Sequence, residues 1–190
     1  MKDNRGFSLV ELIVVVAIMA LLIGFGATRM DVVFGYSAKE ARSKINSSLE
    51  SLQVSCISKS KGNAQTMLAG TSLNADVDVY MEIYKDKDKS GVYYLKYHDL
   101  DNAKKVNETK VKLGPRRIGI SYQLKDAPSP VEVGEEGNGL FLAYDRETGG
   151  FLPLRIVGGK PVYVKYIYCG SGDKTYTLEL MPKTGKVIMK

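Results

Sequence analysis

The chain contains few of the residues from which catalytic and metal centres are usually built. Among its 190 residues there is one histidine, His98, there are two cysteines, Cys56 and Cys169, and there is no tryptophan. Neighbouring strand residues point to opposite faces, so Asp99 cannot orient His98, which we expect at the surface. No zinc cluster, nucleophile elbow, P-loop or dinucleotide-binding glycine pattern occurs. The sequence therefore predicts a protein that is not an enzyme and needs no cofactor.

An apolar stretch near the N-terminus contains a single acid. Residues 7–27 are long enough to cross the ~30 Å hydrocarbon core of a bilayer as a helix. Lys2 and Arg5 before them predict a cytoplasmic N-terminus, with the rest of the chain outside. Glu11 lies within this stretch, where a carboxylate costs at least ~2.5–3.5 kcal/mol on insertion scales. Such a residue indicates a specific partner.

These N-terminal residues resemble the class III signal peptide of type IV prepilins and type II secretion pseudopilins. That family has a short basic leader ending in glycine, then phenylalanine, a short run ending in glutamate, and an apolar helix. The resemblance covers residues 1–29 and departs from the pattern at Asp3, an acid in a usually basic leader. Tyr176–Lys190 resembles, much more weakly, the last strands of FimT/GspH-type minor subunits. The matching N-terminal residues are Lys2, Arg5, Gly6, Phe7, Ser8, Leu9, Val10 and Glu11.

The resemblance implies how the precursor is processed and assembled. A prepilin peptidase would cut between Gly6 and Phe7 on the cytoplasmic side and methylate the new amine of Phe7. Glu11 would then pair with the Phe7 amine of a neighbouring pilin or pseudopilin subunit, with help from the pilus assembly machinery. An amine and a carboxylate are each costly in hydrocarbon but become tolerable as a pair.

Two other interpretations of the N-terminus remain open. A cleaved secretory signal would need small residues in an A-x-A pattern after the apolar region, and none occurs cleanly, although Ala20, Gly24, Gly26 and Ala27 are small. A plain single-pass membrane anchor that never assembles fits the length equally well.

The apolar stretch continues into an amphipathic helix. Apolar residues recur here at intervals of three and four, which places them in one stripe along a helix. The segment Lys59–Asn63, with Gly62 as the C-terminal cap, predicts the end of this helix. We therefore expect a leader at 1–6, an apolar helix at 7–29, an amphipathic helix at 30–62 and a β-rich domain at 63–190. The stripe consists of Ala38, Ala41, Ile45, Leu49, Leu52 and Cys56.

Two glycines lie in the apolar half of the stem. Gly24 and Gly26 each weaken a helix by up to ~1 kcal/mol relative to alanine. They favour close packing against another helix. By the family resemblance, they also mark a place where helical order can be lost on assembly. The stem lacks the proline found in many major pilins.

Beyond the stem the apolar period changes to two, which is typical of half-buried strands. The sequence predicts an α+β protein, in which a long N-terminal helical stem packs against an antiparallel β-sheet domain, the pilin fold. A surface loop is expected at 127–139. The expected strands include residues 77–83, 93–97, 118–125, 140–144, 151–157, 162–168, 175–181 and 186–189.

The two cysteines fall in the part expected to be exported. An oxidising exterior would permit a disulfide between Cys56 and Cys169, and two buried thiols are the alternative.

One loop partly resembles a calcium site. Asp86, Asp88 and Ser90 supply oxygens at alternate positions before Gly91, but the twelfth position holds Tyr97 instead of the bidentate glutamate of an EF-hand. A charged hairpin tip is the better interpretation, with a calcium loop as the alternative.

The expected function is that of a structural subunit of a type IV pilus, a minor pilin. It would begin as a single-pass precursor in the cytoplasmic membrane and end in an extracellular or periplasmic filament. A type II secretion pseudopilin and a DNA-uptake subunit are alternatives. The net charge of +6 is modest and spread along the chain, so it predicts solubility more than a DNA partner. Tyrosines and lysines leave a DNA or carbohydrate ligand open.

Overall fold

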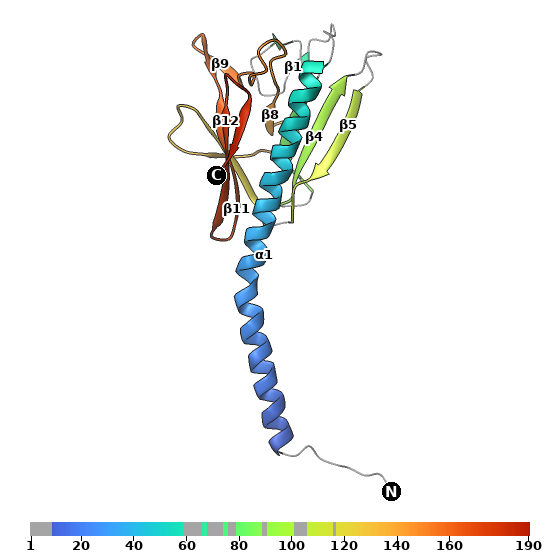
Figure 1. The fold of residues 1–190 in the computed structure, drawn as a ribbon, viewed down its shortest axis with the longest axis vertical. Helices are drawn as coiled ribbons and strands as arrows, with labels where there is room; N and C mark the ends of the chain where they lie inside the picture. The colour runs from blue at the N-terminus through green and yellow to red at the C-terminus, as the bar shows by residue number, and fades with distance from the viewer. Residues whose placement is uncertain are drawn as a thin grey trace.

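The N-terminal part of the protein is one long helix. The computed structural model describes residues 9–58, 66–67, 74–75, 79–88, 91–100, 106–115 and 117–190. Helix α1 runs over Leu9–Ser58 and continues through Gly24 and Gly26 without a break. At ~1.5 Å per residue it is about 75 Å long. Its first half projects away from the globular domain and its second half lies within that domain (Figure 1). The expected stop at Lys59–Asn63 lies outside the described residues.

The second half of α1 supplies the centre of the hydrophobic core. The predicted apolar stripe is confirmed, since Ala38 through Leu52 at these positions are fully buried and Cys56 is nearly so. The stripe faces strands β11, β12 and β3. Arg42, which follows the stripe residue Ala41, is half-buried. Its Nη1 donates to the carbonyl of Lys190 at 2.7 Å, and its guanidinium lies 5.1 Å from the ring centre of Tyr176.

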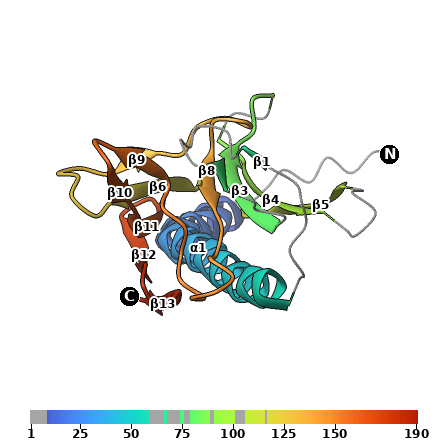
Figure 2. The ribbon, with the colours of Figure 1, turned by 90° about the horizontal axis from the view of Figure 1, so that it is seen from above.

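Two antiparallel sheets flank this half of the helix, which confirms the α+β fold. Seen along the helix, β11, β12 and β13 lie on one side and β3, β4 and β5 on the other (Figure 2). The five-stranded sheet has the order β13 (Lys186–Met189), β12 (Lys174–Met181), β11 (Val164–Ser171), β6 (Gly119–Leu124) and β7 (Val131–Glu132). The four-stranded sheet has the order β5 (Val106–Lys112), β4 (Tyr93–Leu100), β3 (Val79–Lys85) and β8 (Leu140–Leu142). Two short hairpins are formed by β1 (Thr66–Met67) with β2 (Asn74–Ala75), and by β9 (Arg155–Val157) with β10 (Lys160–Val162).

Strand β5 was not predicted from the sequence. It is an edge strand with alternating polar residues, including Lys110 and Lys112, on its outer side. Charged side chains are a common way for proteins to protect an edge against aggregation, and they hide the apolar alternation that marks a strand.

The expected surface loop at 127–139 is wrong in its middle. Val131–Glu132 forms β7, and Val133 is buried in the core. The backbone N–H of Val133 donates to Ile120 in the five-stranded sheet at 3.1 Å, while the carbonyl of Gly134 accepts from Lys85 in the other sheet at 2.8 Å. This segment therefore joins the two sheets. Its prolines and glycines are typical of loops, so the sequence did not predict this role.

A buried carboxylate holds the rest of this segment in place. Glu82 points away from the helix, is 2% exposed, and accepts hydrogen bonds from the N–H groups of Gly137 at 2.6 Å and Gly139 at 3.3 Å. A Cβ at Gly139 would lie 2.3 Å from the carbonyl oxygen of Ile83, so only glycine permits this approach. Burial raises the pKa of Glu82, and the two N–H donors and Lys96 oppose the rise.

His98 is not at the surface, contrary to the expectation. It is 9% exposed, its ring stacks on Tyr80 with centroids 4.5 Å apart, and its Nδ1 lies 3.4 Å from Glu108 Oε1. Glu108 is the residue opposite His98 in the β4–β5 pair. The carboxylate near His98 thus comes from the neighbouring strand and not from the adjacent residue Asp99, so the sequence did not predict it.

No disulfide joins Cys56 to Cys169 in the structure, so the open alternative of two buried thiols is the one observed. Cys56 Sγ lies 3.5 Å from the carbonyl oxygen of Val79, to which it donates. Cys169 instead lies within electrostatic range of Arg42, which precedes Cys56 by about four helical turns, or roughly 21 Å. A disulfide requires Cα atoms within ~7 Å, so the two sites lie at different levels of the stem.

We expect both thiols to remain reduced and protected in the folded protein. Burial raises the pKa of Cys169 to about 12, so its reactive thiolate is scarce at neutral pH. Native Cys169 should react with iodoacetamide at least ~100-fold more slowly than free cysteine. After unfolding without reductant, mass spectrometry should find two alkyl groups per chain, and one in Cys169→Ser. A chain that gains alkyl groups only after reduction would show that the bridge forms.

Glu82→Gln is expected to change the pH dependence of stability. Because the folded state binds the Glu82 proton more tightly than the unfolded chain, ionisation of Glu82 lowers the free energy of unfolding as pH rises above 4.5. Urea unfolding followed by tyrosine fluorescence should therefore show Glu82→Gln gaining stability relative to wild type between about pH 4 and pH 7.

Glu132→Gln is the matched control, because it also removes a carboxylate but should change stability in the opposite direction as pH rises. Hydrogen bonds from Lys85 and Tyr93, both at 2.8 Å, lower the pKa of Glu132. Its stabilising contribution is present at neutral pH and lost as pH falls through that lowered pKa. Glu132→Gln should thus lose stability relative to wild type as pH rises. Parallel pH profiles for Glu82→Gln and wild type would contradict the assignment.

Candidate functional site

The first half of α1 exposes apolar side chains on every side. Leu9 is 75% exposed and Ile23 is 71% exposed, and valines and leucines between them are exposed to a similar degree. A folded monomer rarely exposes a continuous apolar surface of more than a few hundred Å². Exposure all round the helix excludes packing against this chain's own domain, so this surface needs an apolar environment supplied from outside the chain. We call residues 9–24 the exposed stem.

The exposed stem can form without a tertiary partner because a helix satisfies its backbone hydrogen bonds within itself. Leucine, alanine and methionine are strong helix formers, and the β-branched residues among them lower helix propensity only slightly. A helix is also one of the two backbone structures that tolerate a fully apolar surrounding.

Glu11 is the acid in the first turn of α1 and is exposed in this single chain. A carboxylate at a helix N-terminus is favoured by the helix dipole, worth about 0.3–1 kcal/mol at an exposed position. The predicted cleavage and methylation residues, Gly6 and Phe7, lie outside the described residues. Glu11 is thus the part of the predicted site that the structure places, at the free end of the exposed stem.

Among the described residues, no helix is long and apolar enough to cross a membrane. The span expected at 7–29 lies only partly within that part of the chain, because Phe7, Ser8 and the side chains of 25–34 are outside it.

The first residues of the predicted calcium loop, 86–88, follow directly after β3. Asp86 Oδ1 accepts a hydrogen bond from the N–H of Asp88 at 2.9 Å, which is the local bond of an Asx turn. Ser90 lies outside the described residues. Within the residues that are described, no group of three or more histidine, cysteine, aspartate or glutamate side chains is placed to hold a metal ion.

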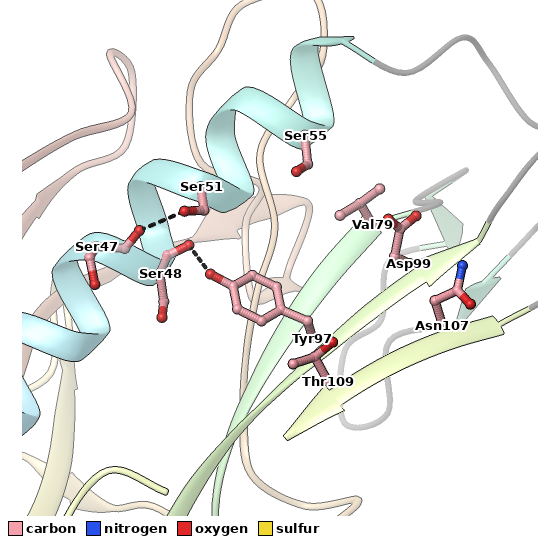
Figure 3. A pocket seen from close by; sticks show the side chains of 9 residues that line it. All are labelled: Ser47, Ser48, Ser51, Ser55, Val79, Tyr97, Asp99, Asn107 and Thr109. Carbon is pink, nitrogen blue, oxygen red and sulfur yellow. Dashed lines mark hydrogen bonds between the residues drawn. The ribbon is translucent and has the colours of Figure 1, made fainter. Parts of the chain in front are cut away.

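A groove in the globular domain was not anticipated from the sequence. It has a volume of about 460 Å³ and lies between α1 and the inner side of β4 and β5 (Figure 3). The sequence signal for this groove is a set of serines on one face of the helix and polar residues at alternate positions of β4 and β5. Its lining consists of Ser47, Ser48, Ser51, Ser55, Val79, Tyr97, Asp99, Asn107 and Thr109.

Charged side chains on the outer face of the four-stranded sheet are matched locally. Lys96 Nζ lies 2.9 Å from Glu136, 3.8 Å from Glu108 and 4.0 Å from Glu82. Lys110 Nζ lies 4.3 Å from the ring centre of Tyr94. These pairings give this face a mixed charge instead of a continuous basic surface.

Comparison with known proteins identifies the N-terminus alone. Residues 1–27 match the family model described as the prokaryotic N-terminal methylation motif, a match that includes Gly6, Phe7 and Glu11. No curated protein and no solved structure matches the chain. The motif implies processing by a prepilin peptidase and assembly with other pilin subunits. This N-terminal motif supports a type IV pilin-like or pseudopilin subunit.

Proposed function

We propose that this protein is a minor pilin, a structural and non-catalytic subunit of a type IV pilus. The observation that supports this most directly is the division of α1 into two halves. The apolar side chains of the exposed stem are exposed in the single chain, whereas the apolar stripe of the second half is buried between two sheets. A subunit with these two parts can place its apolar stem in a filament core and its domain on the outside (Figure 1).

The apolar stem would drive assembly without direction, and Glu11 would supply the direction. Burying apolar surface is worth roughly 25 cal/mol per Å² but hardly distinguishes one helix register from the next. Cleavage between Gly6 and Phe7 creates an amine that the precursor does not have. A buried Glu11 carboxylate would be unfavourable unless it pairs with such an amine from a neighbouring subunit. Assembly would therefore follow cleavage of the membrane-anchored precursor.

A type II secretion pseudopilin is the second candidate, because the same stem serves either filament. The gene neighbourhood separates the two, since retraction genes favour a pilus and secretion genes with an outer-membrane secretin favour a pseudopilus. The mixed charge of the four-stranded sheet's outer face does not favour a DNA-uptake subunit that binds phosphates there.

Gly6→Ala is expected to leave the leader uncut. Glycine lets the backbone approach a protease closely, and a Cβ at the residue before the cleaved bond would obstruct this. Immunoblots of membranes should show only the full-length precursor. Asp3→Ala changes the leader outside the matching pattern and should be cut normally. A trimmed product from Gly6→Ala would count against the peptidase assignment.

Glu11→Ala is expected to be inserted and cleaved but to assemble poorly. Its stem keeps its apolar surface and loses the partner of the Phe7 amine, so incorporation into sheared filaments should fall at least tenfold, which corresponds to about 1.4 kcal/mol. Glu40→Ala is the matched control, because Glu40 is a surface acid of the same helix that pairs with Lys44 at 2.8 Å. Normal incorporation of cleaved Glu11→Ala would falsify the charge-pair role.

A further inference from the structure

We propose that the groove between α1 and strands β4 and β5 binds a small neutral saccharide. This inference goes beyond the filament role and does not depend on it. Its volume of about 460 Å³ lies within the usual range of small-molecule pockets, about 300–1,000 Å³.

The groove exists because the inner face of the four-stranded sheet changes from apolar to polar. Helix α1 makes its main strand contacts with β11, β12 and β3, while β4 and β5 lie one and two strands further away. On β4 the inward residue Leu95 is fully buried in the core, but the next inward residues are Tyr97 and Asp99. Opposite them on β5 are Thr109 and Asn107. The inner face of the sheet is therefore polar where it extends beyond the core.

The helix supplies the same chemistry from the other side. Four serines, at positions 47, 48, 51 and 55, follow one face of α1 next to the apolar stripe. The Ser51 hydroxyl donates to the carbonyl of Ser47 at 3.0 Å, and the Ser47 hydroxyl donates to the carbonyl of Lys44 at 3.1 Å. With their protons directed to the backbone, these two hydroxyl oxygens retain acceptor capacity for a ligand.

Tyr97 gives the groove a fixed aromatic wall. Its hydroxyl donates to the backbone carbonyl of Ser48, so the ring bridges from β4 to the helix (Figure 3). Burial raises the pKa of Tyr97 above its ordinary value of 10.0, so the hydroxyl carries the proton that it donates throughout the neutral pH range. An aromatic ring held in this way offers an apolar surface beside polar groups, which suits the C–H face of a sugar ring.

The lining also excludes other classes of ligand. None of its nine residues is cationic, so it does not suit phosphates or other anions. Asp99 is its sole carboxylate, which is too few for a calcium cage, and Val79 is its sole aliphatic residue, which does not suit a lipid. Hydroxyl, amide and carboxylate groups together match a ligand whose own groups both donate and accept hydrogen bonds.

Saturation-transfer NMR on the cleaved full-length protein tests this proposal. The probes are maltose, cellobiose and di-N-acetylchitobiose, with glucuronate as the anionic comparison. The micelles must be of a detergent without a sugar headgroup, such as dodecylphosphocholine, because alkyl glycosides would compete. We expect saturation transfer to at least one neutral disaccharide and none to glucuronate. Absence of transfer to all three neutral disaccharides at about 10 mM, well above a Kd of ~1 mM, overturns the proposal.

Paired variants locate the binding. Asp99→Ala and Thr109→Val should each raise the Kd of the bound disaccharide. The rise should be about tenfold for Asp99→Ala, because hydrogen bonds to a carboxylate are charge-assisted. Asp173→Ala and Thr175→Val make the same changes at exposed positions outside the groove and should change the Kd by less than about twofold. The tyrosine fluorescence unfolding curve verifies that each variant folds. Equal losses in both pairs, or none in the groove pair, would also refute the proposal.

Discussion

The burial of one face of α1 between two sheets is the constraint on which the rest of the structure depends. The stripe residues from Ala41 to Cys56 pack in one hydrophobic cluster with residues of both sheets. Apolar residues of both sheets pack with this stripe in one hydrophobic cluster, so the helix covers part of both inner faces. The chain end is attached to the same helix through the bond from Arg42 to the carbonyl of Lys190. The second half of α1 is therefore part of the domain's hydrophobic core, and this packing also sets the orientation of the stem relative to the domain.

The two halves of α1 are both helical, but they differ in what their apolar surfaces pack against. Both halves satisfy their backbone hydrogen bonds internally, so both are helical. The second half is amphipathic and finds its apolar partner within the chain. The exposed stem is apolar all round, and its partner must come from a membrane or from other subunits. In the proposed filament, Glu11 at the N-terminal end of the exposed stem would give this non-directional apolar surface one directional contact.

Polar groups define the globular domain as much as its apolar core does. Glu82 fixes the segment between the sheets, because a buried carboxylate must be satisfied and the N–H groups of Gly137 and Gly139 satisfy it. Polar side chains also line the groove. On the inner side of β4 and β5 the side chains are polar, and a space remains there between the sheet and the helix, beside the core.

The amino-acid sequence alone predicts the N-terminal motif, the helix, its buried stripe and an antiparallel β domain, because each is encoded by local order and periodicity. It did not reveal β5, the core role of Val133, the environment of His98 or the serine-lined groove. These depend on neighbours brought together across strands and between strand and helix, such as His98 beside Glu108 and Tyr97 beside Ser48. Tertiary structure decided them, because burial and hydrogen-bond partners are properties of a place in the fold and not of a residue in the chain.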